Sequence, residues 1–468
     1  MFNVLMVTID CLRADGLGCM GYGRPLSPHI DRLAAGSALF TRAFATGPRT
    51  TESFPGILAS TYPLAYGGTF TLPSHLLTLA KVLRPGRYAS AAFHSNPFLL
   101  SEFGYAQGFE HFWDSREKTA VTSKVGARIM PRLNQDSRLY RLLRRMVRYL
   151  EAKTGVSYYT GAEEVTDRAV RWLRGQVQPF LLWVHYMDMH YPFSPPERHI
   201  RQVRPEGVGW RQQARLMVHT LEDPLSVTKE EAQMYRDLYD AGLHYVDENV
   251  GALLDALQRM GILHDTIVVL TADHGEEFLE HGDFGHGALI HVPGTDAARI
   301  KLYDELLHVP LIVRVPGSDV APRQVPSLVS LADVGPTIVD LLGLETVEPW
   351  HGLSLVPLLR GQANSVRDHV FSEYVIRDGD GHWPVVSCRT LRWKYIHDGL
   401  FEHHELYDLE DDPAEQRNLY GSQVPVLSAL QEAVQEHLAL FPSSPLPVVE
   451  AEMDPAVVER LKGLGYLG

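Results

Sequence analysis

The feature that most constrains the fold of this chain is a hydrophobic run that leads directly into an Asp-His pair. Residues 266–272 read Thr-Ile-Val-Val-Leu-Thr-Ala, and Asp273, His274 and Gly275 follow at once. The run is apolar on both faces and rich in β-branched residues, which is typical of a buried strand in a parallel sheet. Ligands of open α/β sheets bind beyond the carboxyl ends of such strands. The stretch therefore predicts an α/β fold with Asp273 and His274 at its functional edge.

The Asp-His pair itself has two interpretations. A carboxylate and an imidazole side by side at a strand end can both reach one divalent cation. The same pair can also do no more than cap a turn, with the aspartate accepting backbone hydrogen bonds. This stretch alone does not distinguish a metal site from a capped turn. The residues at the ends of the other strands provide the further evidence.

Polar residues follow three further strand-like runs, at 4–9, 40–44 and 180–184. The residues that concern us near these ends are Asp10, Thr50, Asp188 and His190. Only a sheet dominated by parallel strands brings such residues to one edge. Carboxylates and imidazoles suit a divalent cation of hard to borderline character, whereas a structural zinc site would call for cysteine pairs. We therefore expect a catalytic metal site at this edge.

A metal site of this kind needs a nucleophile. A hydroxyl bound to a cation is partly deprotonated, so Thr50 could attack an electrophilic phosphorus or sulfur. His190 and His286 could hold the anionic ester oxygens or carry a proton to the leaving group, although a single histidine is more often structural. Cys11 follows Asp10, and the alternation of side chains along a strand predicts that it points away from Asp10.

Composition restricts the partners and the compartment. The chain has 468 residues, a formal net charge of -14 and three cysteines. The length predicts two to three domains, the acidic charge argues against a nucleic-acid partner, and three cysteines cannot form a disulfide framework. Neither a signal peptide ahead of the first strand nor a membrane-spanning stretch is recognisable, so we expect a cytoplasmic protein unless the sequence is the mature form of a longer precursor.

Two changes in composition indicate the domain organisation. Short alternating strands begin after residues 360–366, which predicts a catalytic domain at 1–364 and a smaller α+β subdomain at 365–468. Residues 115–160 form a separate insertion in which arginines recur at helical spacing opposite apolar residues. This basic helix is either the solvated face of a packed helix or a weak contact with an anionic membrane surface or polyanionic substrate.

Several motifs, in order along the chain, resemble the sulfatase-like branch of the alkaline phosphatase superfamily. The resemblance covers essentially the whole chain except 115–160, and ordered motifs over such a span are far more specific than any one of them. The segments that carry it are 3–15, 30–34, 58–63, 271–276, 302–312, 333–337, 405–419 and 464–467.

The resemblance implies a central mixed, mostly parallel sheet between helices, with a smaller antiparallel C-terminal sheet. It implies a divalent metal ion, with zinc or manganese favoured and calcium or magnesium possible. The residues that it implies for metal binding are Asp10, Thr50, Asp273 and His274. Those for catalysis are Thr50, His190 and His286, and those for substrate binding are Asn96, Asp188, His190 and His286.

The chain also departs from the sulfatase pattern. True sulfatases carry Cys or Ser at the nucleophile position, which is converted to formylglycine, and an Arg four residues later. Counting back from the 58–60 motif places Thr50 there, with Thr51 as a one-residue alternative, and Phe54 where the Arg would be. A threonine cannot become formylglycine. Cys11 stands in place of the second of two paired aspartates, and the sulfate-gripping lysine and histidine are not evident at 94–97.

These departures lead to three functional hypotheses. The first is a metal-dependent hydrolase or transferase of phosphate esters that works through a covalent Thr50 intermediate, as in threonine-nucleophile members of the superfamily. The second is a sulfatase that works without formylglycine, and the third is a retired enzyme that only binds anions. The expected substrate is a small-molecule, lipid-linked or glycan-linked anionic ester. The sequence does not indicate an oligomeric state.

Overall fold

The structure is a computed structural model. It describes residues 1–86, 88–115, 159–176, 179–222, 227–286, 289–291, 298–317, 320–345, 347–378 and 381–441. The arginine-rich part of the insertion expected at 115–160 and the C-terminal motif at 464–467 lie outside these residues.

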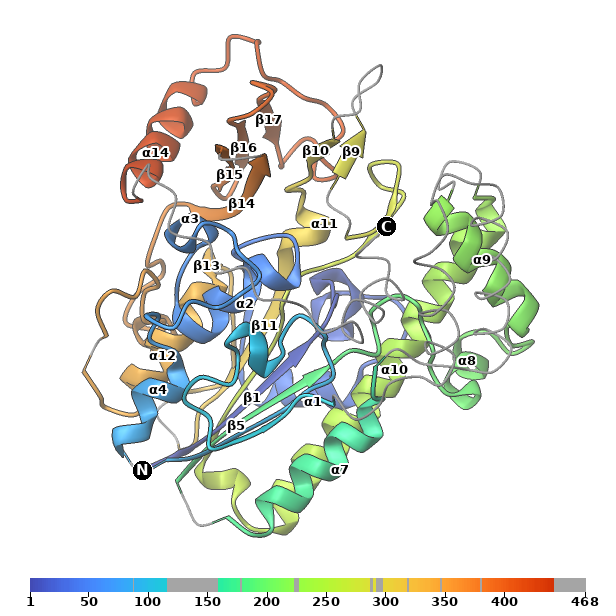
Figure 1. Cartoon of the computed structure of the whole chain (residues 1–468), viewed down its shortest axis with the longest axis vertical. Helices are drawn as coiled ribbons and strands as arrows, with labels where there is room; N and C mark the ends of the chain where they lie inside the picture. Colours follow the sequence, from blue (N-terminus) through green and yellow to red (C-terminus); the bar gives the residue numbers. More distant parts are fainter. Residues whose placement is uncertain are drawn as a thin grey trace.

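A mixed sheet of nine strands forms the centre of the molecule (Figure 1). Its order is β12-β2-β11-β6-β1-β5-β3-β4, and β13 pairs with β2. Its strands are β1 (Asn3–Ile9), β2 (Ala38–Phe44), β3 (Ala89–Phe93), β4 (His111–Trp113), β5 (Phe180–Tyr186), β6 (Thr266–Ala272), β11 (His308–Arg314), β12 (Arg323–Val325) and β13 (Val329–Ser330).

The three central strands explain why the functional residues meet. β1 pairs in parallel with both β5 and β6, and every residue of the three strands is buried. In the register, Ile9 lies opposite Tyr186 on one side and Ala272 on the other, so the three strands end level. β11 runs antiparallel to β2 and β6. The sheet is therefore mixed and mostly parallel, which confirms the predicted fold class.

Helices cover both faces of this sheet (Figure 1). The long helix α10 (Lys229–Arg259) packs against α1 (Pro28–Ala35), α7 (Ala162–Leu173) and α8 (Glu197–Val203), while α2 (Thr50–Ala59) packs against α12 (Val334–Leu341). The remaining helices are α3 (Pro63–Tyr66), α4 (Leu79–Leu83), α9 (Trp210–Glu222), α11 (Asp304–Leu307), α13 (Val356–Leu359) and α14 (Leu427–Ala439). None of the helices in the described part combines the length and the apolar character needed to cross a bilayer.

Helix α2 was not predicted from the sequence, because the segment around Thr50 has the polar composition of a loop. In the structure the helix begins at Thr50 itself, directly after Arg49, whose backbone is extended. Pro55 lies inside the helix and has no N–H for the carbonyl of Thr51. The hydroxyl of Tyr66 donates a hydrogen bond to that carbonyl at 2.9 Å instead. A long-range contact therefore lets the helix start one turn before its proline.

The C-terminal part forms a separate antiparallel sheet, drawn with α14 at the top of Figure 1. Its strands are β14 (Val370–Asp378), β15 (Gly381–Arg389), β16 (Trp393–Asp398) and β17 (Glu405–Asp408). The amide of Glu373 in β14 donates to the carbonyl of Thr46 at 2.8 Å, just after β2. The sheet is therefore joined to the loop that leads to Thr50. The division of the chain at 364/365 stays a prediction.

Short hairpins complete the fold on the functional side. β7 (Glu277–Phe278) pairs with β8 (Phe284–Gly285), and β9 (Leu289–His291) pairs with β10 (Ala298–Ile300), both antiparallel. The first hairpin brings His286 back to the end of β6, where its ring centroid lies 4.5 Å from that of His274.

Candidate active site

Two carboxylates, an imidazole and a hydroxyl meet where β1 and β6 end and α2 begins. His274 Nε2 lies 3.4 Å from Asp273 Oδ2, 3.8 Å from Asp10 Oδ1 and 3.4 Å from Thr50 Oγ1. All four residues are buried. The side chains of Asp10, Asp273 and His274 each offer a ligand atom close enough to the others to hold one metal ion. The structure thus brings together the four residues that the sequence assigned to the metal.

The three histidines of the site are oriented by their Nδ1 atoms. His274 Nδ1 lies 2.9 Å from the carbonyl oxygen of Gly275, which can only accept a proton. His286 Nδ1 lies 2.8 Å from Glu276 Oε2, and His190 Nδ1 contacts the carbonyl of Tyr191. In each ring Nδ1 is the donor, which puts the lone pair of the neutral imidazole on Nε2, the usual arrangement of metal-binding histidines.

Glu276 and Tyr235 extend this support. The Tyr235 hydroxyl donates to Glu276 Oε1 at 2.9 Å, and Glu276 Oε2 accepts from His286. Burial raises the pKa of Glu276 to about 7, although His190 and Tyr235 oppose the shift. Glu276 belongs to the 271–276 motif, but sequence reasoning did not give it this role.

His185 is a functional residue that sequence reasoning missed. Its Nε2 lies 3.2 Å from Asp10 Oδ2, and its Nδ1 lies 3.0 Å from Thr8 Oγ1. Trp183 Nε1–H donates to Thr8 Oγ1 at 2.9 Å, so the Thr8 hydroxyl donates to His185 Nδ1, and His185 Nε2–H donates to Asp10. The only available signal was its position one residue before the end of β5, level with Thr8.

Asn96, predicted to contact the substrate, lies between Asp10 and Thr50. Its Nδ2 donates to Asp10 Oδ2 at 2.8 Å and lies 3.5 Å from Thr50 Oγ1. Burial alone would raise the pKa of Asp10, but the hydrogen bond from His185 and the nearby imidazoles lower it below its usual value. Asp10 is therefore set up to stay ionised at the centre of the site.

The pKa of Asp273 is shifted in the opposite direction from that of Asp10. Burial first, and the neighbouring charge of Asp10 second, raise the pKa of Asp273 well above its usual value. Its Oδ1 accepts from the amides of His274 and Cys11 at 3.0 and 3.3 Å, whereas its buried Oδ2 has no hydrogen-bond partner among the described residues. A buried carboxylate oxygen without a donor is costly. A divalent cation would satisfy this oxygen and allow both carboxylates to ionise, so the residues present fit a metal ion.

Cys11 corrects one sequence-based expectation. Its side chain does not point away from Asp10: Cys11 Sγ lies 3.0 Å from Asp10 Oδ1 and 3.5 Å from His286 Nδ1. The reason is that Cys11 lies just beyond β1 with φ 58°, so strand alternation no longer applies. The thiol is fully buried, and burial together with Asp10, Glu276 and Asp273 raises its pKa well above the usual value.

Asp188 and His190 have different surroundings, although both follow β5. Burial lowers the pKa of His190 to about 4, and its ring centroid lies 4.8 Å from that of His286, so it faces the site as a neutral imidazole. The Asp188 carboxylate accepts from the amide of Ala162 at the start of α7, and burial raises its pKa to about 8. The contacts of Asp188 are thus with α7, and its predicted role in substrate binding stays a prediction.

The two neighbouring threonines are distinguished by their partners. Thr50 Oγ1 faces His274 and Asn96, whereas the Thr51 hydroxyl donates to Glu52 Oε2 at 2.8 Å. Arg49 binds Glu52 Oε1 at 3.1 Å, and its guanidinium carbon lies 4.6 Å from the ring centre of Tyr374 in β14. The geometry therefore favours Thr50 as the hydroxyl available to a metal and a substrate.

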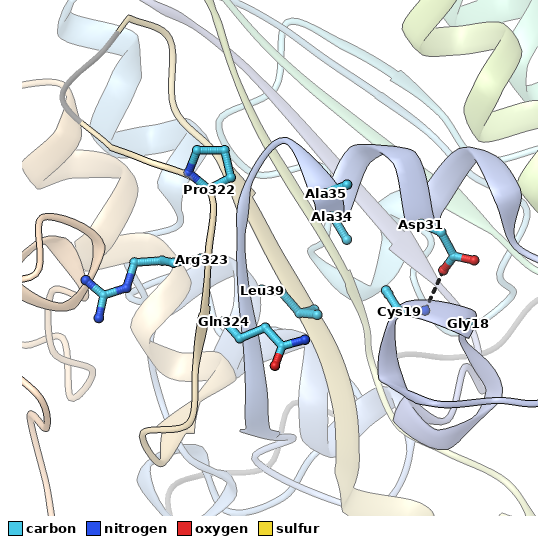
Figure 2. Close-up of a pocket in the computed structure, with 9 residues that line it drawn as sticks. All are labelled: Gly18, Cys19, Asp31, Ala34, Ala35, Leu39, Pro322, Arg323 and Gln324. Carbon is cyan, nitrogen blue, oxygen red and sulfur yellow. Dashed lines mark hydrogen bonds between the residues drawn. The ribbon is translucent and has the colours of Figure 1, made fainter.

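A pocket of about 500 Å³ lies at the opposite edge of the sheet (Figure 2). It is bordered by the end of α1, the start of β2 and residues 322–324, and it includes Cys19, whose amide donates to Asp31 Oδ1 at 2.7 Å. Leu39 belongs to the amino-terminal half of β2, whereas Thr50 follows the carboxyl end of that strand. This pocket is therefore not part of the metal cluster.

A family model described as Sulfatase matches residues 2–344. The chain belongs to the sulfatase family. A second model, described as the C-terminal part of N-sulphoglucosamine sulphohydrolase, matches residues 298–441 of this sulfatase-family protein. Members of the family generally bind a divalent metal ion, in agreement with the donor set of the cluster.

Curated relatives are also sulfatases by name. The chain is 34% identical over 208 residues to a choline-sulfatase of Rhizobium meliloti, covering 44% of this chain and 37% of the relative. It is 27% identical over 326 residues to arylsulfatase K of Bos taurus, covering 62% and 58%. The match to the uncharacterized sulfatase YidJ of Escherichia coli is 26% identical and covers 89% and 82%. The sulfatase-family chain thus spans less than two thirds of the first two relatives.

Two solved structures share the fold of this chain. The phosphonate monoester hydrolase of Agrobacterium radiobacter is 25% identical, has a TM-score of 0.71, and the match covers 94% of this chain and 95% of that one. A structure in complex with its substrate D-glucosamine-2-N,6-O-disulfate is 20% identical, has a TM-score of 0.70 and covers 94% and 97%. The second likeness shows the fold alone.

Proposed function

We propose that this sulfatase-family protein hydrolyses phosphate esters, or transfers their phospho group, through a covalent intermediate on Thr50 that needs a divalent metal ion. The observation that supports this most directly is the position of the Thr50 hydroxyl, 3.4 Å from His274 Nε2 and beside the Asp10–Asp273 pair. Asp10, Asp273, His274 and Thr50 would hold the cation. When bound, it lowers the pKa of a hydroxyl and attracts the ester oxygens.

The residues of the chain then have separable roles. The Thr50 oxygen forms a bond to phosphorus as the bond from phosphorus to the leaving oxygen breaks. His190 and His286, held neutral by burial, can accept the proton that Thr50 loses and return it to the departing alkoxide. Water attacks the phosphothreonine in the second half-reaction and restores Thr50. In a transferase, an acceptor hydroxyl replaces the water.

Two observations support phosphorus over sulfur. A threonine side chain acts as a simple alkoxide nucleophile and cannot carry the formylglycine on which the sulfatase reaction depends. One similar structure is a phosphonate monoester hydrolase, so this fold accommodates phosphorus esters.

Zinc or manganese is the favoured ion because the donor set combines carboxylates and imidazoles. The favoured substrate is a small-molecule, lipid-linked or glycan-linked anionic ester.

A sulfate ester is the second candidate. The choline-sulfatase and arylsulfatase relatives, and the structure bound to a disulfated glucosamine, favour it by name. In this reaction Thr50, or a water molecule in its place, would attack sulfur without formylglycine. A phosphodiester and a sulfate monoester each carry one negative charge, so the charge of the site does not separate them.

Turnover of three esters separates these candidates. Metal-stripped protein is reloaded with zinc, manganese, magnesium or calcium and assayed with p-nitrophenyl phosphate, bis-p-nitrophenyl phosphate and p-nitrophenyl sulfate. Thr50→Ala and Thr51→Ala serve as the test and the matched control. Quenched reactions are digested with a protease, and mass spectrometry is used to look for an added phosphoryl group on the peptide that contains Thr50.

Phosphoester turnover that requires both the metal and Thr50, with a phosphorylated peptide, supports the first candidate. Sulfate turnover alone overturns it in favour of the second. No turnover of any ester, with unchanged anion binding in Thr50→Ala, indicates a member of the family that has lost catalysis.

A further inference from the structure

Cys11 lies within the metal cluster, although the sequence gave it no role there. Its backbone turn at φ 58° directs Sγ to within 3.0 Å of Asp10 Oδ1 and 3.5 Å of His286 Nδ1. Cys11 forms a potential metal-binding group with Asp10 and His190, and another with His274 and His286. Every residue of these groups is buried. The sulfur is therefore close to His190, His274 and His286.

An independent observation shows that this space is suited to a cation. Asp273 Oδ2, in the same cluster, is fully buried, and no residue in the described part of the chain forms a hydrogen bond with it. The backbone amide of Cys11 donates to the other oxygen of the same carboxylate at 3.3 Å, so this carboxylate is held beside the backbone of Cys11. The alternative role for Cys11 is a simple one, in which its S–H does no more than donate to Asp10.

We propose that Cys11 is a thiolate ligand of the metal site and makes the site select a borderline cation, such as zinc, over calcium or magnesium. The inference rests on the metal-dependent function proposed above and adds the ligand that decides which ion is used. Sulfatases carry a second aspartate at this position, and a carboxylate favours hard cations. Replacing that oxygen by sulfur changes the preference of the site, because soft thiolates select zinc and similar ions while carboxylates suit magnesium and calcium.

Coordination changes the protonation of the thiol. A cation held here would be bound by Sγ as a thiolate, and the S–H proton would leave to solvent, since a metal-bound thiol is deprotonated. The hydrogen bond from Cys11 to Asp10 would then be absent, and Asp10 Oδ1 could serve as a ligand. Asp10 would keep its contacts with His185 and Asn96 through Oδ2.

Cobalt provides a spectroscopic test that does not depend on turnover. Metal-stripped protein is titrated with Co²⁺, and the near-ultraviolet sulfur-to-cobalt charge-transfer band is compared with the visible bands of the bound ion. The variants are Cys11→Ser, with Cys388→Ser and Cys19→Ser as controls. Cys388 is equally buried but lies in the C-terminal sheet, and Cys19 lines the pocket at the opposite edge.

We expect a charge-transfer band in the wild type and both controls, and its loss in Cys11→Ser. Visible bands without any charge-transfer band in the wild type overturn the inference while leaving the metal-dependent function intact. No cobalt, zinc or manganese binding at all overturns both. If Cys11→Ser does not fold, X-ray absorption of the zinc-loaded wild type decides the matter, because a zinc–sulfur distance of about 2.3 Å is distinct from zinc–nitrogen and zinc–oxygen distances.

The preference for the ion gives a second, independent readout. Cys11→Asp restores the carboxylate that sulfatases carry at this position. We expect its affinity for zinc relative to calcium to fall by about 100-fold or more, as measured by competition dialysis. An unchanged ratio in Cys11→Asp would show that the thiol is only a hydrogen-bond donor to Asp10.

Discussion

Two buried groups of charged side chains in this fold differ in how their charge is balanced. One is the network where α11 meets the C-terminal sheet: Lys394 Nζ binds Asp304 at 2.9 Å and Glu415 at 2.8 Å, and Arg389 binds Asp304 at 3.1 Å. The other is the metal cluster, where Asp10, Asp273 and Glu276 are contacted by imidazole, amide, phenol and backbone groups. The first group contains its own lysine and arginine, whereas none of the described residues places a lysine or arginine in ion-pair contact with Asp10, Asp273 or Glu276.

The difference shows how a structural charge can be told from a functional one. In the network, Asp304 and Lys394 keep each other ionised despite burial: Arg389 and Lys394 lower the pKa of Asp304, and the two acids raise the pKa of Lys394. In the metal cluster, burial and Asp10 raise the pKa of Asp273. A buried carboxylate that the protein does not neutralise is costly to keep unless a ligand compensates it. The network therefore stabilises the fold, and the cluster is arranged for a bound cation.

Thr50→Ala tests the functional half of this comparison. We expect the loss of esterase activity to be on the order of 10⁴-fold or more, because the variant lacks the hydroxyl that we propose as the nucleophile. The melting temperature should change little, since the hydroxyl makes only long contacts with His274 and Asn96. Activity and melting are measured on the same preparation. Equal losses in Thr51→Ala and Thr50→Ala would contradict the assignment.

Lys394→Met tests the structural half. Removing the amine leaves Asp304 and Glu415 buried without their shared cation. We expect the free energy of unfolding to fall by about 3–5 kcal/mol in urea titrations. Arg201→Met is the matched control, because Arg201 pairs with Glu197 at 2.9 Å where both side chains are exposed, and its loss should matter little. If both variants behaved alike, burial would not explain the stability of the network.

Asp273→Asn distinguishes the cluster from the network by the sign of its effect. The amide oxygen can still accept from His274 and Cys11, but the side chain can no longer ionise to bind a cation, and no carboxyl group has to stay protonated beside Asp10 in the metal-free protein. We expect affinity for the divalent cation to fall by about 100-fold, while the metal-free protein becomes slightly more stable at pH 7. Calorimetric titration with zinc and urea unfolding in the presence of a chelator measure the two effects. A less stable metal-free variant would place Asp273 with the structural charges.

Asp188→Asn gives the smallest expected effect and tests pH dependence. The unfolded carboxyl loses its proton near pH 4, whereas the folded one, with a pKa of about 8, keeps it. The folded state therefore binds the extra proton between these values, and stability falls as the pH rises from about 4 to 8. The asparagine removes this dependence and should raise the free energy of unfolding at pH 8 by about 2 kcal/mol. Urea titrations at pH 5 and pH 8 measure it, and a parallel pH dependence in both proteins would contradict it.

The central strands and the polar residues that follow them could be predicted from the sequence, because their signals are local. The apolar runs at 4–9 and 266–272 coincide with β1 and β6, and the polar residues after them lie at one edge because parallel strands end level. The family followed from ordered motifs, which the family model confirms. Each of these signals needs only neighbouring residues, or motifs whose spacing is fixed by the chain.

What the tertiary structure decided depends on contacts between distant residues. The turn at Cys11, the link from Trp183 through Thr8 to His185 and Asp10, and the orientation of His286 by Glu276 and Tyr235 have no local signature. The start of α2 likewise depends on the Tyr66 hydroxyl. The sequence by itself determined which chemical groups reach the edge of the sheet. Only packing determined which atom of each group faces the metal cluster. The reason is that the hydrogen bond made by one atom of a side chain, such as His286 Nδ1, decides which other atom is turned toward the cluster.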